Sequence, residues 1–300
     1  MIKRILVPLD GSSLAESVLP VAAALAKKIN ISVTLIHVIE KTAPEKIHGQ
    51  SHLQLPKDAD AYLKTIAGLD IFNEVDVKIH VHDEGIKNVS QSIADHSKEL
   101  NQDIVLMCTH GNSGLLDILY GSIAQQVISI GHIPVLLINP SEENVNLKYS
   151  FENFLIPLDG NTDHETALNY ASDLAKFCQA KINLLTAIPH FGNMSGKLTP
   201  ANRFLPFTTT TMMDMIVPDT EDYLKKIKER LELSSLTVTT NISRKDPEIA
   251  IIEEAQNINA DLIIIGTHAK KGSEAFWEGS ITPKISKSTT VPLLLIPVNK

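Results

Sequence analysis

Two aspartates follow apolar, strand-like segments at matching places in the chain. Asp10 ends the segment "ILVPLD" and Asp159 ends "FLIPLD". A carboxylate at the carboxyl end of a strand can accept hydrogen bonds from ribose hydroxyls or bind a magnesium ion. The simpler interpretation is an Asp-Gly turn before a capped helix. Both interpretations place the two carboxylates at the rim of a sheet.

Two glycine-containing loops, each followed by Gly-Ser, could hold a phosphate. The loops read "CTHGNSG" from Cys108 and "GTHAKKG" from Gly266, and Gly-Ser follows at 121–122 and at 279–280. Glycine lets the backbone approach a ligand, and the free N–H groups that begin a helix favour an anion. An ordinary strand-to-helix loop with a serine cap is the alternative for each feature alone. Their repetition in one order favours an anion site.

The chain repeats itself, which explains why each feature occurs twice. Asp159 follows Asp10 by 149 residues, whereas His268 follows His110 by 158, so the second copy is longer in its middle. The segment 189–216, rich in Pro, Thr, Met and Phe, is predicted to be irregular and to hold the extra length. Two long copies indicate two domains rather than a solenoid. We predict domains at 1–140 and 151–300, joined by a polar linker at 141–150.

Strands and helices alternate within each copy. In the first copy, apolar runs and helical periodicity predict strands near 2–9, 32–39, 75–82, 103–108 and 133–138, and helices near 13–29, 57–69, 86–100 and 122–130. Capping boxes are predicted at Ser13 with Glu16 and at Thr162 with Glu165, and a helix start at Asp246-Pro247. The predicted fold class is α/β, with two tandem doubly wound domains, each a five-stranded parallel sheet flanked by helices (Rossmann-like).

The composition limits the classes of function. The chain has 300 residues, a net charge of −8 and two unpaired cysteines, Cys108 and Cys178. A nucleic-acid-binding protein would normally be basic, so no nucleic-acid partner is expected. The apolar runs are shorter than the ~20 residues that span a bilayer, and the start of the chain does not resemble a signal peptide. We therefore expect a cytoplasmic protein without a membrane partner.

Other reactive residues have two interpretations each. His80 and His82 lie two apart on a predicted strand, where they either bind a metal with Asp83 or Glu84 or belong to a polar edge strand. Cys108 is either redox-active or a small residue at a strand end. No nucleophile–base pair, pair of catalytic carboxylates or zinc motif is recognisable, so we predict no enzyme and no resident metal.

The sequence resembles the universal stress protein family, with two family domains in tandem over nearly its whole length. The segments that carry the resemblance are "ILVPLDGS", "LIHVI", "CTHGNSGLLDILYGS" and "IPVLLI", with their counterparts in the second half. Nucleotide-binding members show G-x-x-G, nine residues, then G-S or G-T. The resemblance implies ATP or a related adenine nucleotide, held by the first-strand aspartate, the end of the second strand and the glycine loop.

Carried onto this chain, the resemblance implies two sets of nucleotide-binding residues. The first copy offers Pro8, Asp10, Val38, Met107, Gly111, Gly121 and Ser122, and the second offers Pro157, Asp159, Ala187, Ile265, Gly266, Gly279 and Ser280. Each copy departs from the motif once, because Cys108 and Ala269 stand where glycines are expected. An alanine forced into left-handed backbone costs about 1–2 kcal/mol, or about tenfold in affinity. We expect at least one half to bind, with the first favoured.

The function expected from these observations is regulatory binding. A cytoplasmic stress-response protein would bind ATP, with or without Mg²⁺, and change its conformation or its partners. In the family, the last strands pair between subunits, so the two halves are expected to pair with each other, and a homodimer of the chain is also possible. The alternative is a non-nucleotide module in which the 189–216 segment binds an apolar ligand or a protein partner.

Overall fold

The computed structural model describes residues 2–42, 46–47, 49–109, 122–130, 133–140, 149–161, 165–188, 206–268 and 281–298. For residues 47, 51, 122, 166, 206–216 and 268 only the backbone is described. Several predicted features lie outside the described residues. They are Gly111, Gly121, Ala269, Gly279 and Ser280, the Thr162 cap, most of the linker, and residues 189–205 of the irregular segment.

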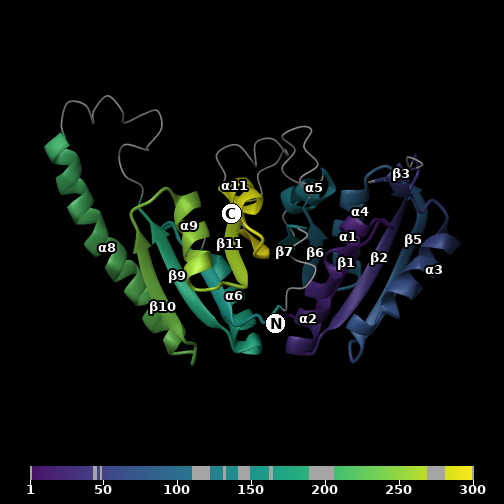
Figure 1. Ribbon diagram of the computed structural model, residues 1–300, viewed down its shortest axis with the longest axis horizontal. Coiled ribbons are helices and arrows are strands. Elements are labelled where there is room, and N and C mark those ends of the chain that lie inside the picture. The colour runs from purple at the N-terminus through teal and green to yellow at the C-terminus, as the bar shows by residue number, and fades with distance from the viewer. Residues whose placement is uncertain are drawn as a thin grey trace.

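Ten strands form one sheet across both halves (Figure 1). The order is β10-β9-β8-β11-β12-β7-β6-β1-β2-β5, so each half has its first strand in the middle and its last strand at the junction. The first half contributes β1 Arg4–Pro8, β2 Ser32–Glu40, β5 Val77–Ile86, β6 Ile104–Cys108 and β7 Val135–Ile138, and the second contributes β8 Asn153–Pro157, β9 Lys181–Ala187, β10 Val238–Ser243, β11 Leu262–His268 and β12 Leu293–Val298.

The two halves meet through their last strands. Strands within each half are parallel, whereas β7 and β12 pair antiparallel, with Leu136 opposite Leu294. The sheet is therefore mixed and mostly parallel, which confirms the predicted α/β tandem fold. Because β7 and β12 are central, the exposed edges belong to β5 and β10.

Helices cover both faces of this sheet. One apolar core joins it to α2 Leu19–Ile29, α3 Pro56–Ala67, α6 Thr166–Cys178 and α8 Pro206–Glu232; the other joins it to α4 Val89–Glu99, α5 Ser122–Ile130, α9 Pro247–Asn257 and α11 Thr282–Ser288. Neighbouring strand residues alternate between the cores, as Ile5 and Leu6 do. Strands buried on both faces read as continuous apolar runs, and this is why "RILVPL" lacks a polar alternation.

Contacts between side chain and backbone add to the strand pairing at the junction. Asn139 Nδ2 donates to the carbonyls of Ser286 and Thr289, each at 3.1 Å. The Tyr170 hydroxyl on α6 donates to the Asp103 carbonyl at 3.2 Å. Helices α2 and α6 also pack against each other, and the first core contains residues of both halves. The two halves thus share the first of the two hydrophobic cores.

The predicted helix at 13–29 is wrong in one respect, because it is two helices. The chain forms α1 Ser13–Glu16 and then α2, which has Pro20 in its first turn. Proline has no N–H to donate to the preceding turn, so the first helix ends and a new one begins. The cap is also one residue earlier than predicted: Ser12 Oγ accepts from Ala15 N at 3.1 Å, and Glu16 accepts from the Tyr62 hydroxyl instead.

The longer middle of the second half is less irregular than predicted. Helix α8 begins at Pro206 and continues through Pro218 to Glu232, so residues 206–216 are helical. Its later part buries Leu224, Ile227 and Leu231 against the first core, as an amphipathic surface helix does. The Asp246 cap is confirmed, since its carboxylate accepts from Glu248 N at 3.1 Å. Helix α11 begins at Thr282, beyond the Gly-Ser pair predicted to open it.

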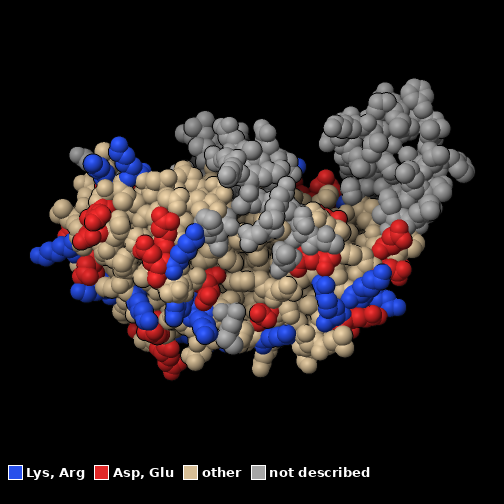
Figure 2. Space-filling view, turned by 180° about the vertical axis from the view of Figure 1, so that it is seen from behind, with Lys and Arg blue, Asp and Glu red and all other residues tan. Residues whose placement is uncertain are grey.

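Short elements after β2 were not predicted. They are a two-stranded hairpin, β3 Lys46–Ile47 and β4 Gln50–Ser51, and a 3₁₀ turn, η1 Asp70–Phe72. On the face shown in Figure 2, the acidic and basic side chains of the described residues are interspersed rather than gathered into a basic stripe. No helix in the described part of the chain combines the length and hydropathy needed to cross a membrane.

Candidate functional site

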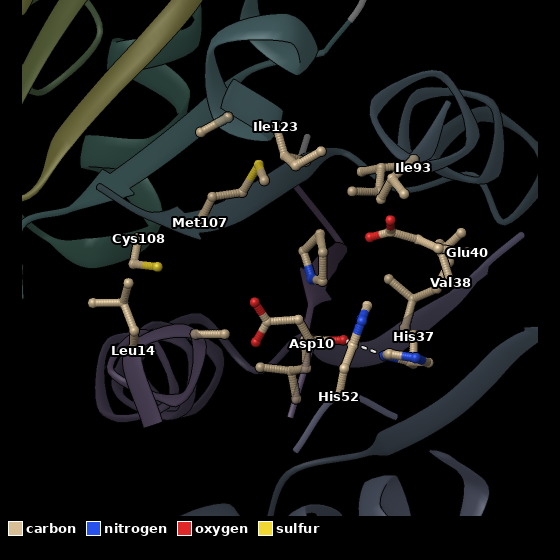
Figure 3. Close-up of a pocket in the computed structure, with 16 residues that line it drawn as sticks. Asp10, Leu14, His37, Val38, Glu40, His52, Ile93, Met107, Cys108 and Ile123 are labelled. Atoms are coloured by element: carbon tan, nitrogen blue, oxygen red, sulfur yellow. Dashed lines mark hydrogen bonds between the residues drawn. The ribbon is translucent and has the colours of Figure 1, made fainter. Parts of the chain in front are cut away.

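A pocket of about 310 Å³ opens at the carboxyl ends of β1, β2 and β6 (Figure 3). Strand β1 lies between the other two, at the point where the strand order reverses. Ligands of doubly wound sheets bind at this switch point. Its lining residues come from these strands, α1, α4, α5 and the segment after β4: Pro8, Leu9, Asp10, Leu14, Ala15, Ile36, His37, Val38, Glu40, His52, Val89, Ile93, Met107, Cys108, Ile123 and Ala124.

Four of the predicted first-half residues line this one pocket. Pro8 and Asp10 come from the end of β1, Val38 from β2 and Met107 from β6. Of the remaining three, Gly111 and Gly121 lie outside the described residues. Ser122 begins α5, whose next two residues, Ile123 and Ala124, line the pocket. The first turn of this helix therefore reaches the site.

The Asp10 carboxylate is held in place by the turn that follows it. Its Oδ1 accepts from Ser12 N at 2.9 Å and from Ser12 Oγ at 2.6 Å. Ser12 Oγ in turn accepts from Ala15 N, which connects the carboxylate to the start of α1. In the described part of the chain both bonds use Oδ1, so Oδ2 remains available to a ligand. The Asp-Gly turn and the binding carboxylate are thus compatible interpretations of one residue.

Cys108 lies in the pocket wall as an ordinary thiol. Burial, and to a lesser degree the negative charge of Asp10, raise its pKa to about 12. A reactive cysteine needs the thiolate, which is scarce at neutral pH with such a pKa. The structure therefore favours the small-residue interpretation of Cys108 over the redox one.

Three polar residues of the pocket were not singled out from the sequence. His37 and Glu40 flank Val38 on β2, and His52 follows β4. His37 is fully buried, and its nitrogens lie 2.7 Å from the Leu9 carbonyl and 3.0 Å from the Leu53 carbonyl. The segment "LIHVI" contained His37 but gave no sign of its role. His52 had no sequence signal, because it follows a hairpin that no pattern predicts.

The second half repeats the backbone of this rim. Leu158 N donates to the Leu185 carbonyl at 2.8 Å, as Leu9 N does to Ile36 at 2.8 Å. Asp159 Oδ1 accepts from Asn161 N at 3.0 Å, as Asp10 does from Ser12. The other predicted second-half residues that the structure describes lie on neighbouring parallel strands: Pro157 ends β8, Ala187 ends β9, and Ile265 and Gly266 lie in β11.

The histidines on β5 belong to an edge strand, as one of their two interpretations expected. The rings of His80 and His82 each lie 4.8 Å from the ring of His96 on α4. Burial, followed by the nearby His96 and His82, lowers the pKa of His80. No group of three or more ligating side chains with metal-binding geometry occurs in the ranges that the structure describes. The described contacts of the cluster are thus ring packing between β5 and α4.

A glycine beside the pocket gives a stability prediction. Gly11 has φ +89°, and an added Cβ would lie 3.0 Å from Leu53 Cδ1, whereas at Gly160, φ +78°, no described atom lies within 4 Å. Left-handed backbone costs an alanine about 1–2 kcal/mol at either site. Gly11→Ala must also displace Leu53, and overpacking adds about 1–3 kcal/mol. Urea unfolding should show Gly11→Ala as the more destabilised variant; equal losses would contradict the close packing.

The comparisons with known proteins identify the family and the fold. The profile of the universal stress protein family matches residues 1–139 and 150–297. A universal stress protein of Mycolicibacterium smegmatis is 21% identical over 301 residues, covering 97% of this chain and 96% of its own. One of Methanocaldococcus jannaschii is 28% identical over 148 residues, covering 47% of this chain and 85% of its own. The crystal structure of a universal stress protein from Archaeoglobus fulgidus has a TM-score of 0.66 at 17% identity and covers 99% of this chain and 97% of its own.

Proposed function

Because the chain belongs to the universal stress protein family, with two family domains in tandem, we propose that it binds an adenine nucleotide in the first-half pocket. The nucleotide is ATP or a close relative. Binding regulates the protein, and the nucleotide is a regulatory ligand rather than a substrate. The pocket lies at the switch point of the sheet, the usual ligand site of such folds.

One observation carries the proposal. Pro8, Asp10, Val38 and Met107 belong to three different strand ends, and they line a single pocket together with the first turn of α5. Chain segments so far apart in sequence meet here only because of the fold. The volume of about 310 Å³ is at the small end for ligand pockets and fits a nucleoside, with the phosphates directed outward.

Different lining residues suit the base, the ribose and the phosphates of a nucleotide. Val38, Ile93 and Met107 offer apolar surface to a planar base. Asp10 Oδ2 is placed to accept from a ribose hydroxyl or to share a Mg²⁺ ion with the phosphates, since hard oxygen ligands suit that ion. No lysine or arginine is among the described lining residues. Backbone N–H groups at the start of α5 would therefore hold the phosphate.

We propose binding in the first half and pairing of the halves as the route to regulation. The second half repeats the Asp turn at Asp159. Titration of the Asp10 and Asp159 variants tests nucleotide binding in each half. A nucleotide at β1 and β6 lies next to β7, which forms the junction with β12, so a change at the pocket can reach the other half through the sheet. Assembly of two chains into a homodimer is a further proposal that sedimentation would test.

Thermal unfolding with and without ligand tests the proposal directly. A ligand that binds only the folded state raises stability by about 2.7 kcal/mol at a hundredfold excess over Kd. We expect the melting temperature to rise with ATP and Mg²⁺, and an adenine nucleotide to be released by acid from freshly purified protein. The absence of both effects would contradict nucleotide binding, and steady phosphate release would show an ATPase instead.

A further inference from the structure

One imidazole in the pocket has a nitrogen without a partner. His52 is only 8% exposed and lines the pocket. Its Nδ1 is buried and makes no hydrogen bond within the described chain. A buried polar atom normally has a partner, so this nitrogen is a hydrogen-bonding group that the described chain leaves unused. Figure 3 shows the ring of His52 reaching up between Asp10 and Val38.

The neighbouring histidine does not supply that partner. The rings of His37 and His52 meet edge to face, with centroids 6.2 Å apart and an angle of 80°. Both nitrogens of His37 already face the carbonyls of Leu9 and Leu53. His37 therefore positions the segment that carries His52 rather than bonding to it.

The residues before and after His52 are held in place by hydrogen bonds and packing. Before it, Gln50 Oε1 accepts from Ser13 N at 2.7 Å, which connects the β3–β4 hairpin to the start of α1. After it, the Leu53 carbonyl lies 3.0 Å from His37 Nε2, and the Leu53 side chain packs against Gly11. A side chain held this way loses little further freedom when it binds a ligand, so its hydrogen bond contributes to affinity.

We infer that His52 is a specificity-determining residue that reads the heterocyclic base of the bound nucleotide through Nδ1. This inference rests on the proposed function of the same pocket. A base presents donors and acceptors along one edge, and an imidazole nitrogen can serve as either, depending on its tautomer. Apolar walls for the ring and one polar atom at its edge are the usual features of a base pocket.

The position of His52 favours the base over the phosphates. Figure 3 shows His52 on the far side of the pocket from Ile123, which belongs to the first turn of α5. The described polar lining includes two carboxylates, Asp10 and Glu40, and no cationic Lys or Arg. Without a cation between them, carboxylates repel a phosphate, whereas they accept hydrogen bonds directly from amino groups and hydroxyls.

The test measures the affinities of adenosine, ADP and ATP by calorimetry for the wild type and His52→Phe. Phenylalanine retains the ring and removes its nitrogens. Loss of one hydrogen bond should weaken all three ligands by the same factor, about 3- to 10-fold. His82→Phe is the matched control, because its Nε2 is also buried without a described partner but lies outside the pocket lining. It should bind as the wild type does.

Each result separates the two proposals. Wild-type affinity in His52→Phe, or a loss that grows with the number of phosphates, overturns the role in base recognition while nucleotide binding stands. A wild type that binds none of the three ligands overturns both. Should His52→Phe fail to fold, ¹⁵N spectra of the wild-type histidines decide: adenosine should shift the Nδ1 resonance of His52, and an unchanged resonance overturns the inference.

Discussion

Leu294→Asp is expected to unfold both halves of the protein together. Leu294 lies on β12 with no exposed surface, opposite Leu136 of β7, in a core that contains residues of both halves. A buried carboxylate without a partner costs about 3–5 kcal/mol or more. Domains are stable by only about 5–15 kcal/mol, so this loss removes much of the total. Urea unfolding followed by far-UV circular dichroism measures it.

The control for this variant is another leucine-to-aspartate change. Leu233 is 89% exposed, so Leu233→Asp should leave the free energy of unfolding within about 0.5 kcal/mol of the wild type. The informative quantity is the number of transitions. A first half that unfolds at its wild-type midpoint while the second half is already unfolded would show that the shared core contributes little.

Asp10→Ala is expected to weaken ATP binding by about 10- to 100-fold. The variant removes the one lining carboxylate at the end of β1, and hydrogen bonds to charged groups contribute about 1.5–3 kcal/mol each. The effect is larger than that of His52→Phe because the Asp10 acceptor is charged. Calorimetric titration with ATP and Mg²⁺ measures the change.

Asp10 also supports its own turn, so the design needs two further variants. Asp10→Asn can keep the Oδ1 acceptor for Ser12 while removing the charge, and it should still lose most of the affinity. Asp159→Ala removes the matching carboxylate of the second half and should leave the high-affinity titration unchanged. Loss of binding in Asp159→Ala alone would move the site to the second half.

Much of the fold could be predicted because its signals are local. Predicted strands such as 103–108 and 133–138 agree within two residues with β6 Ile104–Cys108 and β7 Val135–Ile138. The errors lie where local rules compete. Pro20 divides a continuous helical pattern, and helix α8 extends over a segment whose Pro and Thr content suggested irregular structure.

The candidate site was predictable only in part. Asp10 could be found because it follows a strand-like segment in a recognisable turn, and Val38 because the family resemblance implied it. His52 could not, because it reaches the pocket through a hairpin tied to Ser13 and His37 by contacts between distant residues.

The sequence by itself determined the duplication, the alternation of strands and helices and the aspartates at the rim. These depend on repeats, periodicity and turn chemistry within a few neighbouring residues. The family resemblance implied that the two halves pair through their last strands; only the tertiary structure decided that β7 and β12 do so antiparallel in one sheet of ten strands, and that His52 lines the pocket with a buried Nδ1 that has no described partner. Such features arise when segments distant in the chain compete for the same buried surface, and no local pattern of residues records the outcome.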